Sequence, residues 1–401
     1  MRIFTNKTVK DAALDRIRFL FDEFPSVVVS MSGGKDSTTV FELALQVARE
    51  KNRLPLPVMW LDQEAEWQGT ADYVDEVMRR PEVKPYWYQV PMVMTNNASS
   101  FERYSHCWKS GDEEKWIRPQ SPISIKENRF GVERFHEFFA AIAKVDFPSK
   151  TCFIAGVRTE ESPKRAMSLT YARTYRWITW GKVLNKTREQ FTFYPIYDWG
   201  WHDVWKFIHD NKVRYNRVYD EMYRHGVNVK DMRISNLHHE TAIQNLMLVQ
   251  EIEPQTWNRL AARIDGANTI KHIHKASFTA PKEVPSMFQS WEAYAKHLAD
   301  TIIQEEKYRK MLYDRVNSLK KVYDGENVKD HFFRMVVNTI LSSDWDFTKL
   351  NNWTLSSAGL SYKRFKQGKY LPGMLQDAKF FTTAELQLLM DKINATVKTT
   401  N

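Results

Sequence analysis

One segment restricts the fold of this chain more than any other feature. It consists of a predicted strand, a glycine turn and a predicted helix, which follow one another without a break. Val27–Val29 are three consecutive β-branched residues, a run typical of a buried strand. The turn over residues 32–37 reads Ser-Gly-Gly-Lys-Asp-Ser, and a helical pattern runs over residues 39–49. The backbone N–H groups of such a turn point one way beside a helix N-terminus, where an anion can bind. The segment therefore predicts a phosphate-binding loop.

The side chains of this turn suit a phosphate group and its counter-ion. Lys35 supplies a positive charge, and Ser32 and Ser37 supply hydroxyl donors. Asp36 offers a carboxylate that can hold Mg²⁺ against a phosphate chain. The spacing is not that of a Walker A loop, because no glycine precedes Gly34 by five residues. The competing interpretation is a plain Gly-Gly turn with a solvated lysine.

Composition narrows the class of protein. At 401 residues the chain is long enough for two domains. It has no run of eighteen apolar residues and no apolar N-terminal signal, so we expect a cytoplasmic protein without membrane association. Cys107 and Cys152 are its only cysteines, too few for the four thiolates of a [4Fe–4S] cluster, so we expect no Fe–S cluster. The net charge of +9 favours polyanionic partners.

Strand and helix patterns alternate over the first half of the chain. In order, the predicted elements are a helix over 8–24, a strand over 26–30, a helix to about residue 49, a strand over 58–61, a helix over 70–80, a strand over 86–90, a helix over 131–145 and a strand over 151–157. This rhythm predicts an α/β fold with a doubly wound parallel sheet. Ligands of such sheets bind at the carboxyl ends of the strands, so the loops after Val29, Leu61 and Val90 should line one crevice.

Two regions depart from this rhythm. Residues 91–130 are irregular and polar, and a loop of this length is usually functional or mobile. Helical patterns dominate after about residue 226. We therefore predict two domains: residues 1–225 with the insert at about 91–130, and a basic, mainly α-helical domain over 226–401. In the second domain, residues 362–370 interleave aromatic residues with four cations, which indicates a nucleic-acid contact or a solvated loop.

The Ser-Gly-Gly-Lys-Asp-Ser sequence at 32–37 resembles the pyrophosphate-binding loop of the adenine nucleotide α-hydrolase superfamily. That superfamily includes N-type ATP pyrophosphatases, thiouridine synthases and the phosphoadenylylsulfate (PAPS) reductases. Its enzymes typically cut ATP between the α and β phosphates, release pyrophosphate and pass AMP to a substrate. The resemblance implies the HUP-type α/β fold, ATP and Mg²⁺ as cofactors, and a nucleotide site made by Ser32, Gly33, Gly34, Lys35, Asp36, Ser37, Asp62, Gly156 and Arg158.

A second motif follows the predicted strand over 151–157. Residues 156–165 resemble the Gly-x-Arg-x-x-Glu-Ser-x-x-Arg signature of the PAPS reductase branch, in which this strand end faces the phosphate groups of the nucleotide. Gly156 permits close backbone approach, and Arg158 and Arg165 can clamp oxyanions. The alternative is a surface ion pair between Arg158 and Glu161.

A third match, over residues 194–220, resembles a region of the same branch with the spaced pattern Pro-(x)n-Trp-x-x-x-Asp-Val-Trp-x-(hydrophobic)n-x-Tyr-Asn-x-x-Tyr. Its residues are expected to be structural: Trp205 and Ile208 share a helical face, and Asp203 is expected to cap the helix rather than act as a catalytic acid. The resemblance covers about residues 25–225.

The chain departs from the reductase pattern in two places. After Asp62 the branch has a Thr-Gly pair, whereas residues 63–67 here read Gln-Glu-Ala-Glu-Trp, whose carboxylates can bind a metal or reject a sulfonucleotide. The reductases also carry a nucleophilic cysteine in a C-terminal tail, and no cysteine follows Tyr219 here. Because a thiolate is the nucleophile of that reduction, sulfate reduction is not expected.

The arrangement most resembles PAPS-reductase-like proteins with an added C-terminal helical domain of unknown function. Such proteins occur in bacteria, plasmids and phages, often beside a ParB/sulfiredoxin-like protein, which the resemblance implies as a partner. No defined reaction comes with this resemblance.

Three functions remain open. In the first, the chain cleaves ATP between the α and β phosphates and adenylylates a substrate that is unidentified and can be nucleic-acid-linked, with Lys35, Asp36, Arg158 and Arg165 as catalytic residues. In the second, it is a non-catalytic adenine-nucleotide-binding regulator that acts with DNA or a ParB-like partner.

In the third, it is a sulfur transferase that uses Cys107, because the adjacent His106 can lower a thiol pKa. The simpler interpretation of Cys107 is a loop cysteine packed by Trp108, and Cys152 is expected in the core. The histidine pairs at 238–239 and 272/274 lack the further ligands of a zinc site.

Overall fold

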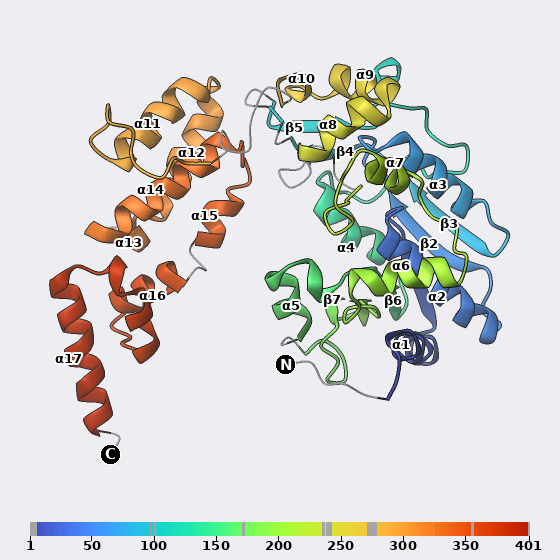
Figure 1. The fold of residues 1–401 in the computed structure, drawn as a ribbon, viewed down its shortest axis with the longest axis horizontal. Helices are drawn as coiled ribbons and strands as arrows, with labels where there is room; N and C mark the ends of the chain where they lie inside the picture. The colour runs from blue at the N-terminus through green and yellow to red at the C-terminus, as the bar shows by residue number, and fades with distance from the viewer. Residues whose placement is uncertain are drawn as a thin grey trace. The chain divides into compact units, whose positions relative to one another are not determined.

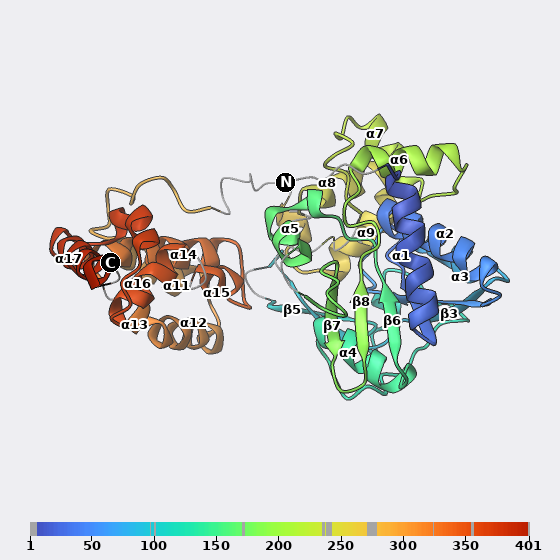
Figure 2. The same ribbon diagram turned by 90° about the horizontal axis from the view of Figure 1, so that it is seen from below.

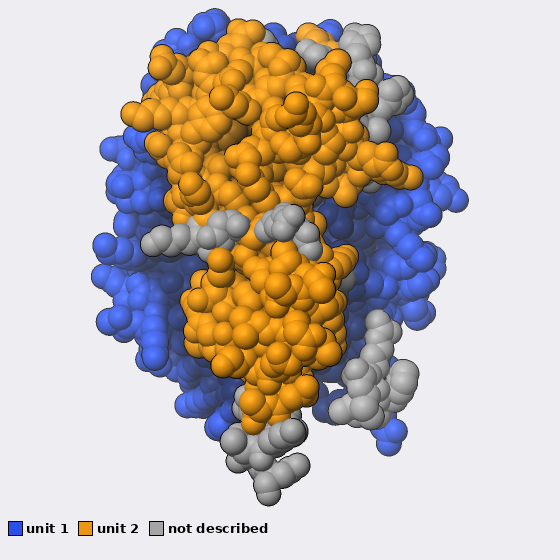
Figure 3. Space-filling model, turned by 90° about the vertical axis from the view of Figure 1, so that its left-hand side faces the viewer, with its two compact units in different colours: residues 1–94, 105–263 blue, residues 95–104, 264–401 orange. Residues whose placement is uncertain are grey.

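The computed structural model describes residues 6–96, 98–99, 102–170, 173–234, 237, 243–270, 279–323, 325–353 and 357–399. The chain forms two compact units (Figure 3): unit 1 comprises 1–94 and 105–263, and unit 2 comprises 95–104 and 264–401. The boundaries between these units differ from the predicted boundary between residues 225 and 226. Residues 226–263 belong with unit 1, and part of the predicted insert belongs with unit 2.

Unit 1 is built on a six-stranded sheet in the order β3-β2-β1-β6-β8-β7. Its strands are β1 (Ser26–Ser30), β2 (Leu56–Leu61), β3 (Val83–Tyr88), β6 (Thr151–Ile154), β7 (Gly181–Asn185) and β8 (Gln190–Phe193). All neighbouring strands are parallel except β7, which pairs antiparallel with β8. The predicted parallel doubly wound sheet is therefore confirmed.

Helices cover both faces of this sheet (Figure 1 and Figure 2). Val27 and Val29 of β1 pack in the same apolar cluster as α1 (Val9–Glu23), α2 (Lys35–Glu50), α3 (Gln68–Met78) and α6 (Trp201–Asp210). Val28 points the other way and packs with α4 (Phe135–Asp146). This alternation explains why three consecutive valines form one strand, since both faces of β1 are buried.

The remaining elements of unit 1 are short. The insert contains the β4–β5 pair (Met92–Thr95 and Tyr104–Cys107) and η1 (Glu113–Lys115). The other helices are η2 (Thr159–Glu161), α5 (Pro163–Thr170), α7 (Val218–Arg224), α8 (Ile243–Ile252) and α9 (Pro254–Arg263). As predicted, Asp203 caps α6, because its Oδ2 accepts a hydrogen bond from the Gly200 N–H at 2.7 Å.

Unit 2 is helical, as predicted for the C-terminal part of the chain. Its helices are α10 (Ala267–Ile270), α11 (Trp291–Ile302), α12 (Glu306–Ser318), α13 (Lys320–Tyr323), α14 (Glu326–Leu341), α15 (Thr348–Trp353), α16 (Ser357–Lys366), η4 (Pro372–Phe380) and α17 (Thr383–Thr399). Its core gathers around α14, where the Tyr323 ring stacks on Phe332 with centroids 3.9 Å apart. Within the described residues, no helix is long and apolar enough to cross a membrane.

The basic segment 362–370 is the end of α16 and the turn after it rather than a loop with exposed rings. Tyr362 is fully buried and Phe365 packs on the same core, so neither ring is free to stack on a base. Lys363, Arg364 and Lys369 are exposed. Their charges are available to phosphate groups, but the predicted interleaved stacking surface is not present.

Candidate functional site

The predicted phosphate-binding loop connects β1 to α2. Gly33 has a φ of +70°, a left-handed conformation that favours glycine, and a Cβ there would lie 2.7 Å from the Thr70 Cγ2 atom. Gly34 is the N-cap of α2 and provides no side-chain cap, so the first N–H groups of the helix face the turn. The hydroxyls of Ser32 and Ser37 lie 3.0 Å apart beside it. The turn therefore has the form that the sequence predicted.

The second predicted motif leaves the neighbouring strand. β1 and β6 are parallel neighbours with Val29 opposite Ile154, and the connections of the sheet run in opposite directions from them. Loops that follow two such strands enclose the usual ligand crevice of an α/β sheet. A Cβ on Gly156 would lie 2.5 Å from the carbonyl carbon of Asp36 and 2.7 Å from the Ser37 nitrogen. The two motifs are thus in backbone contact.

Replacement of Gly156 by alanine is expected to push the two motifs apart, because the new methyl group would meet backbone atoms that cannot rotate away. Overpacking of this kind costs about 1–3 kcal/mol of folding free energy. We expect the thermal midpoint to fall by about 2–12 °C, since a domain of this size loses about 2–4 °C per kcal/mol. Gly373→Ala is the control, because a Cβ there meets nothing within 4 Å. An unchanged thermal midpoint in Gly156→Ala would contradict the prediction.

Three of the four predicted catalytic residues meet at this point. Arg158 is 4% exposed, and its Nε donates to Asp36 Oδ1 at 2.5 Å. Lys35 is 7% exposed, and its Nζ lies 3.3 Å from Asp36 Oδ2. The Arg158 side chain does not form the surface pair with Glu161 considered above, because Glu161 is paired with Arg165. Lys35, Asp36 and Arg158 form one buried charged cluster above the turn.

Arg165 lies on α5 at the edge of the same cluster. Its side chain is 44% exposed, and desolvation by its neighbours, followed by the nearby charge of Arg233, lowers the pKa of Arg165 below its usual value. It still carries a positive charge at neutral pH. The fourth predicted catalytic residue is therefore brought toward the other three.

These groups line a cavity of about 360 Å³, which is within the size range of small-molecule sites. Its apolar wall comes from Met31, from Met59–Leu61 at the end of β2, and from Phe135 and Phe139 of α4. Its charged lining consists of five cations and three carboxylates: Lys35, Arg158, Arg165, Lys230, Arg233, Asp36, Glu66 and Glu161. The excess of positive charge and the apolar wall suit a ligand with a flat ring and phosphate groups.

Some lining residues were not predicted from the sequence. Lys230, Met232 and Arg233 follow the predicted domain boundary at residue 225, yet they line the cavity of unit 1. The Met232 carbonyl accepts a hydrogen bond from Lys35 Nζ at 3.5 Å. The available signal was a polar, basic stretch directly after the third motif.

Tyr219 was expected to be structural, and it is also part of the site. Its hydroxyl accepts a hydrogen bond from the Lys35 backbone N–H at 3.1 Å, and its ring centroid is 5.4 Å from Lys35 Nζ. Burial, followed by the Asp36 carboxylate, raises the pKa of the Tyr219 hydroxyl. The hydroxyl is therefore neutral at physiological pH and holds the first turn of α2.

Asp62 does not line the cavity, contrary to the prediction. It is fully buried, and its Oδ1 accepts a hydrogen bond from Arg118 at 2.7 Å. Its Oδ2 accepts hydrogen bonds from Trp87 Nε1 at 3.2 Å and Gln89 Nε2 at 2.9 Å. The carboxylate is placed at the strand end as expected, but Arg118 of the insert covers it.

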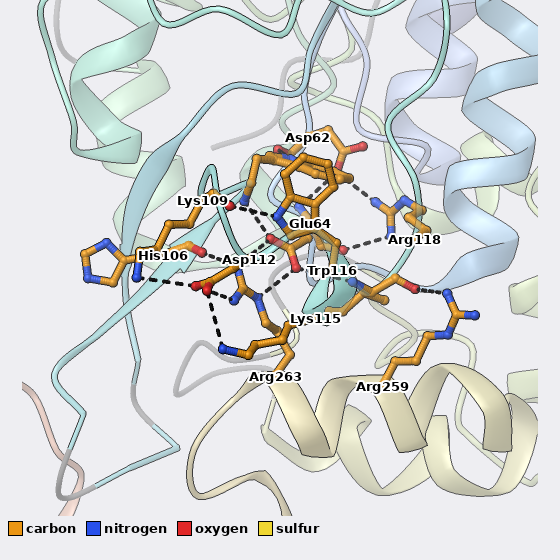
Figure 4. A network of polar contacts seen from close by, with 12 residues as sticks. Asp62, Glu64, His106, Lys109, Asp112, Lys115, Trp116, Arg118, Arg259 and Arg263 are labelled. Carbon is orange, nitrogen blue, oxygen red and sulfur yellow. Dashed lines mark hydrogen bonds and ion pairs between the residues drawn. The ribbon is translucent and has the colours of Figure 1, made fainter.

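Figure 4 shows the network around Asp62 and Glu64. Glu64 is 1% exposed, and its Oε1 accepts a hydrogen bond from Arg263 Nε at 2.9 Å. Glu64 Oε2 accepts a hydrogen bond from the Trp108 backbone N–H at 2.6 Å. Asp62 and Glu64 therefore bind arginines and backbone groups rather than a metal.

The structure does not place a metal site at Asp36 either. Both of its carboxylate oxygens are engaged, by Arg158 and by Lys35. In the described part of the chain, no three His, Cys, Asp or Glu side chains are grouped to hold an ion. The residues present do not fit the predicted Mg²⁺ ligand role of Asp36, and the two histidine pairs at 238–239 and 272/274 lie outside the described residues.

Charged contacts also explain why residues 243–263 belong to unit 1. The Glu253 carboxylate caps α3, because it accepts the Gln68 N–H at 2.7 Å and the Gly69 N–H at 2.9 Å. Arg259 of α9 donates to the Ile117 carbonyl at 2.9 Å. Together with Arg263, these residues tie α8 and α9 to the loop and helix that follow β2.

Neither cysteine is placed as a nucleophile. Cys107 is 4% exposed, and burial, followed by the Glu64 carboxylate, raises the pKa of its thiol well above the usual value. Cys152 is buried in β6, as predicted, and burial also raises the pKa of its thiol. Because the thiolate is the reactive form, these environments oppose a sulfur transferase that uses Cys107.

The fold and the phosphate loop define a nucleotide-utilising protein with the adenine nucleotide α-hydrolase-like fold. Residues 26–225 match the phosphoadenosine phosphosulfate reductase domain, and residues 226–349 match a domain of unknown function (DUF3440). The chain therefore belongs to the PAPS-reductase-like proteins that carry this C-terminal domain, and the predicted family is confirmed.

Its relatives include named enzymes and proteins without an assigned activity. The uncharacterized protein YbdN of Escherichia coli is 27% identical over 320 residues, which cover 75% of this chain and 77% of YbdN. The phosphoadenosine 5'-phosphosulfate reductase of Alteromonas mediterranea is 23% identical over 221 residues. The aligned region covers 53% of this chain and 73% of the reductase. Among solved structures, the FMN adenylyltransferase of Candida glabrata superposes with a TM-score of 0.34 at 14% sequence identity. The superposed region covers 54% of this chain and 62% of the adenylyltransferase chain.

Proposed function

We propose that this chain binds ATP in the cavity of unit 1 and cleaves it between the α and β phosphates, passing AMP to an acceptor. The observation that carries the proposal is the meeting of Lys35, Arg158 and the 32–37 turn at the ends of two adjacent parallel strands. Backbone N–H groups at a helix N-terminus bind phosphate oxygens, and buried cations stabilise charge that develops on a leaving group.

The proposed step is a displacement at the α phosphorus. A lone pair on the acceptor forms the new bond to that phosphorus, the bond from the phosphorus to the bridging oxygen breaks, and pyrophosphate leaves with the electron pair. Lys35 and Arg158 would stabilise the negative charge of the pyrophosphate, and Arg165 would do so from the cavity edge. The apolar wall with Phe135 and Phe139 would hold the adenine ring.

Product analysis tests this proposal. ATP labelled in the α phosphate is incubated with the full-length protein, with and without co-purified nucleic acid. The expected products are pyrophosphate together with labelled AMP or a labelled acceptor. Release of ADP and orthophosphate would contradict it.

One observation favours a non-catalytic regulator as the second candidate. The Asp36 carboxylate already engages both Arg158 and Lys35, so part of the cationic charge is neutralised within the protein. A regulator would bind ATP without consuming it, and the exposed cations of α16 would contact DNA. Tight ATP binding with no release of pyrophosphate, in the presence of DNA and of a ParB-like partner, would select this candidate.

A further inference from the structure

A second pocket of about 510 Å³ shares a wall with the ATP cavity proposed above. Tyr219 and Met232 belong to the lining of both pockets. The other lining residues of the second pocket are mainly aromatic or apolar: Trp201, Trp205, Asp220, Tyr223, Arg224 and Val229. None of the motifs singled out in the sequence assigns a ligand to it.

The aromatic side chains come from matching positions on two helices. Trp201 and Trp205 are four residues apart on α6, and Tyr219 and Tyr223 are four residues apart on α7. Residues at this spacing lie on one face of a helix. The rings of Trp205 and Tyr219 meet edge to face with centroids 5.5 Å apart, so the two faces are turned toward each other. Met232 completes the wall from the segment after α7.

One property of these side chains points to an occupant. Tyr223 is 67% exposed, an unusual setting for a ring that lines an otherwise apolar pocket. A planar ring stacked on Tyr223 would cover this side chain.

The charges around the pocket select among planar and cationic ligands. Lys230 Nζ lies 5.8 Å from the Trp201 ring centroid. The two charged residues of the lining are already paired, Arg224 with Glu221 at 2.5 Å and the Asp220 carboxylate with Arg217 at 2.9 Å. The positive charge of Lys230 opposes a quaternary ammonium group, the usual occupant of an aromatic cage. It favours a ring that carries a negative group.

We infer that this pocket binds the base of a second nucleotide, with Lys230 beside Trp201 as the cation for its phosphate. Base stacking on aromatic side chains and phosphate contacts with cations are the two general components of nucleotide recognition. The same chemistry is supplied by a free mononucleotide or by an unstacked base of a single-stranded nucleic acid.

The position of the pocket gives the second nucleotide a role that rests on the proposed function. Because Tyr219 and Met232 line both spaces, the two pockets are neighbours, and the role that follows for the second nucleotide is that of the acceptor of AMP. An oxygen of its phosphate or sugar bonds to the α phosphorus, the bond to the bridging oxygen breaks, and pyrophosphate leaves with the electron pair. The proton of a sugar hydroxyl passes to water.

Titration calorimetry tests the binding site separately from catalysis. AMP, GMP, CMP and UMP are titrated into the full-length protein whose first cavity is saturated with the non-cleavable analogue α,β-methylene-ATP. We expect at least one of them to bind, and Tyr223→Ala to weaken that binding by about tenfold or more, since stacking contributes about 1–3 kcal/mol per base. Because Tyr223 is exposed, we expect this variant to fold, and its thermal midpoint checks this. Trp177→Ala is the matched control, because Trp177 is 75% exposed and is not part of the pocket lining.

Further arms identify the source of the base and the ways in which the inference fails. A single-stranded tetranucleotide that binds more tightly than every mononucleotide, and is weakened by Tyr223→Ala, assigns the base to nucleic acid. Absence of binding by all of these probes at millimolar concentration overturns the inference, as does equal binding by wild type and Tyr223→Ala. Binding without any pyrophosphate release from ATP keeps the second site and refutes the proposed function instead.

Discussion

Replacement of Lys35 by methionine is expected to lower the rate of pyrophosphate release from ATP by about 10²–10³-fold, or about 2.7–4 kcal/mol of transition-state stabilisation. Lys35 lines the cavity, and its side chain is only 8% exposed, so its charge acts on the phosphates with little screening by water. Methionine keeps the length and apolar volume of the side chain and removes the charge. The fold should survive, because Asp36 still accepts the hydrogen bond from Arg158 Nε at 2.5 Å.

Lys51→Met is the matched control for this experiment. Lys51 directly follows the same helix, is exposed, and pairs with Asp22 far from the cavity lining. Its variant should release pyrophosphate at the wild-type rate, as measured with labelled ATP. A wild-type rate in Lys35→Met would contradict the role of the lysine. An equal loss in both variants would show that the effect does not arise in the cavity.

The sheet was predictable because its central strands have strong local patterns. The run of valines gives β1 its predicted bounds, since a strand buried on both faces needs no alternation. The start of β3 was missed by three residues because Pro85 interrupts the pattern, and proline lowers the expectation of a strand. β7 and β8 were not predicted. They are short, and Val183 of β7 is exposed at the sheet edge.

Site residues could be predicted from the sequence only where they lie together in one contiguous motif. The 32–37 and 156–165 motifs each follow a strand, so the topology of a parallel sheet brings them together without further information. Asp62 met the same criterion and was wrongly assigned to the cavity. Its partner Arg118 is 56 residues away in an irregular insert, and no local pattern predicts that contact. Glu64 and Arg263 are 199 residues apart and were missed for the same reason.

Arg118→Met is expected to lower the free energy of unfolding of unit 1 by about 3–5 kcal/mol, the usual cost of leaving a buried charge without its partner. Asp62 is fully buried and Arg118 is 5% exposed, so water cannot replace the lost contact. The variant also removes the hydrogen bond from Arg118 to the Glu64 carbonyl at 2.8 Å. With about 2–4 °C per kcal/mol for a domain of this size, the thermal midpoint should fall by about 6–20 °C.

A double variant separates charge from packing. Asp62→Asn combined with Arg118→Met leaves no unpaired charge, and replacing both members of a buried pair is often close to neutral. The double variant should therefore recover most of the stability that Arg118→Met loses, as measured by urea unfolding. Arg79→Met is the control, because Arg79 at the C-cap of α3 is exposed and its pairing with the partly buried Asp75 is open to solvent, so its loss should leave the midpoint unchanged. If the double variant is no more stable than Arg118→Met, the network acts through shape rather than through the pairing of its charges.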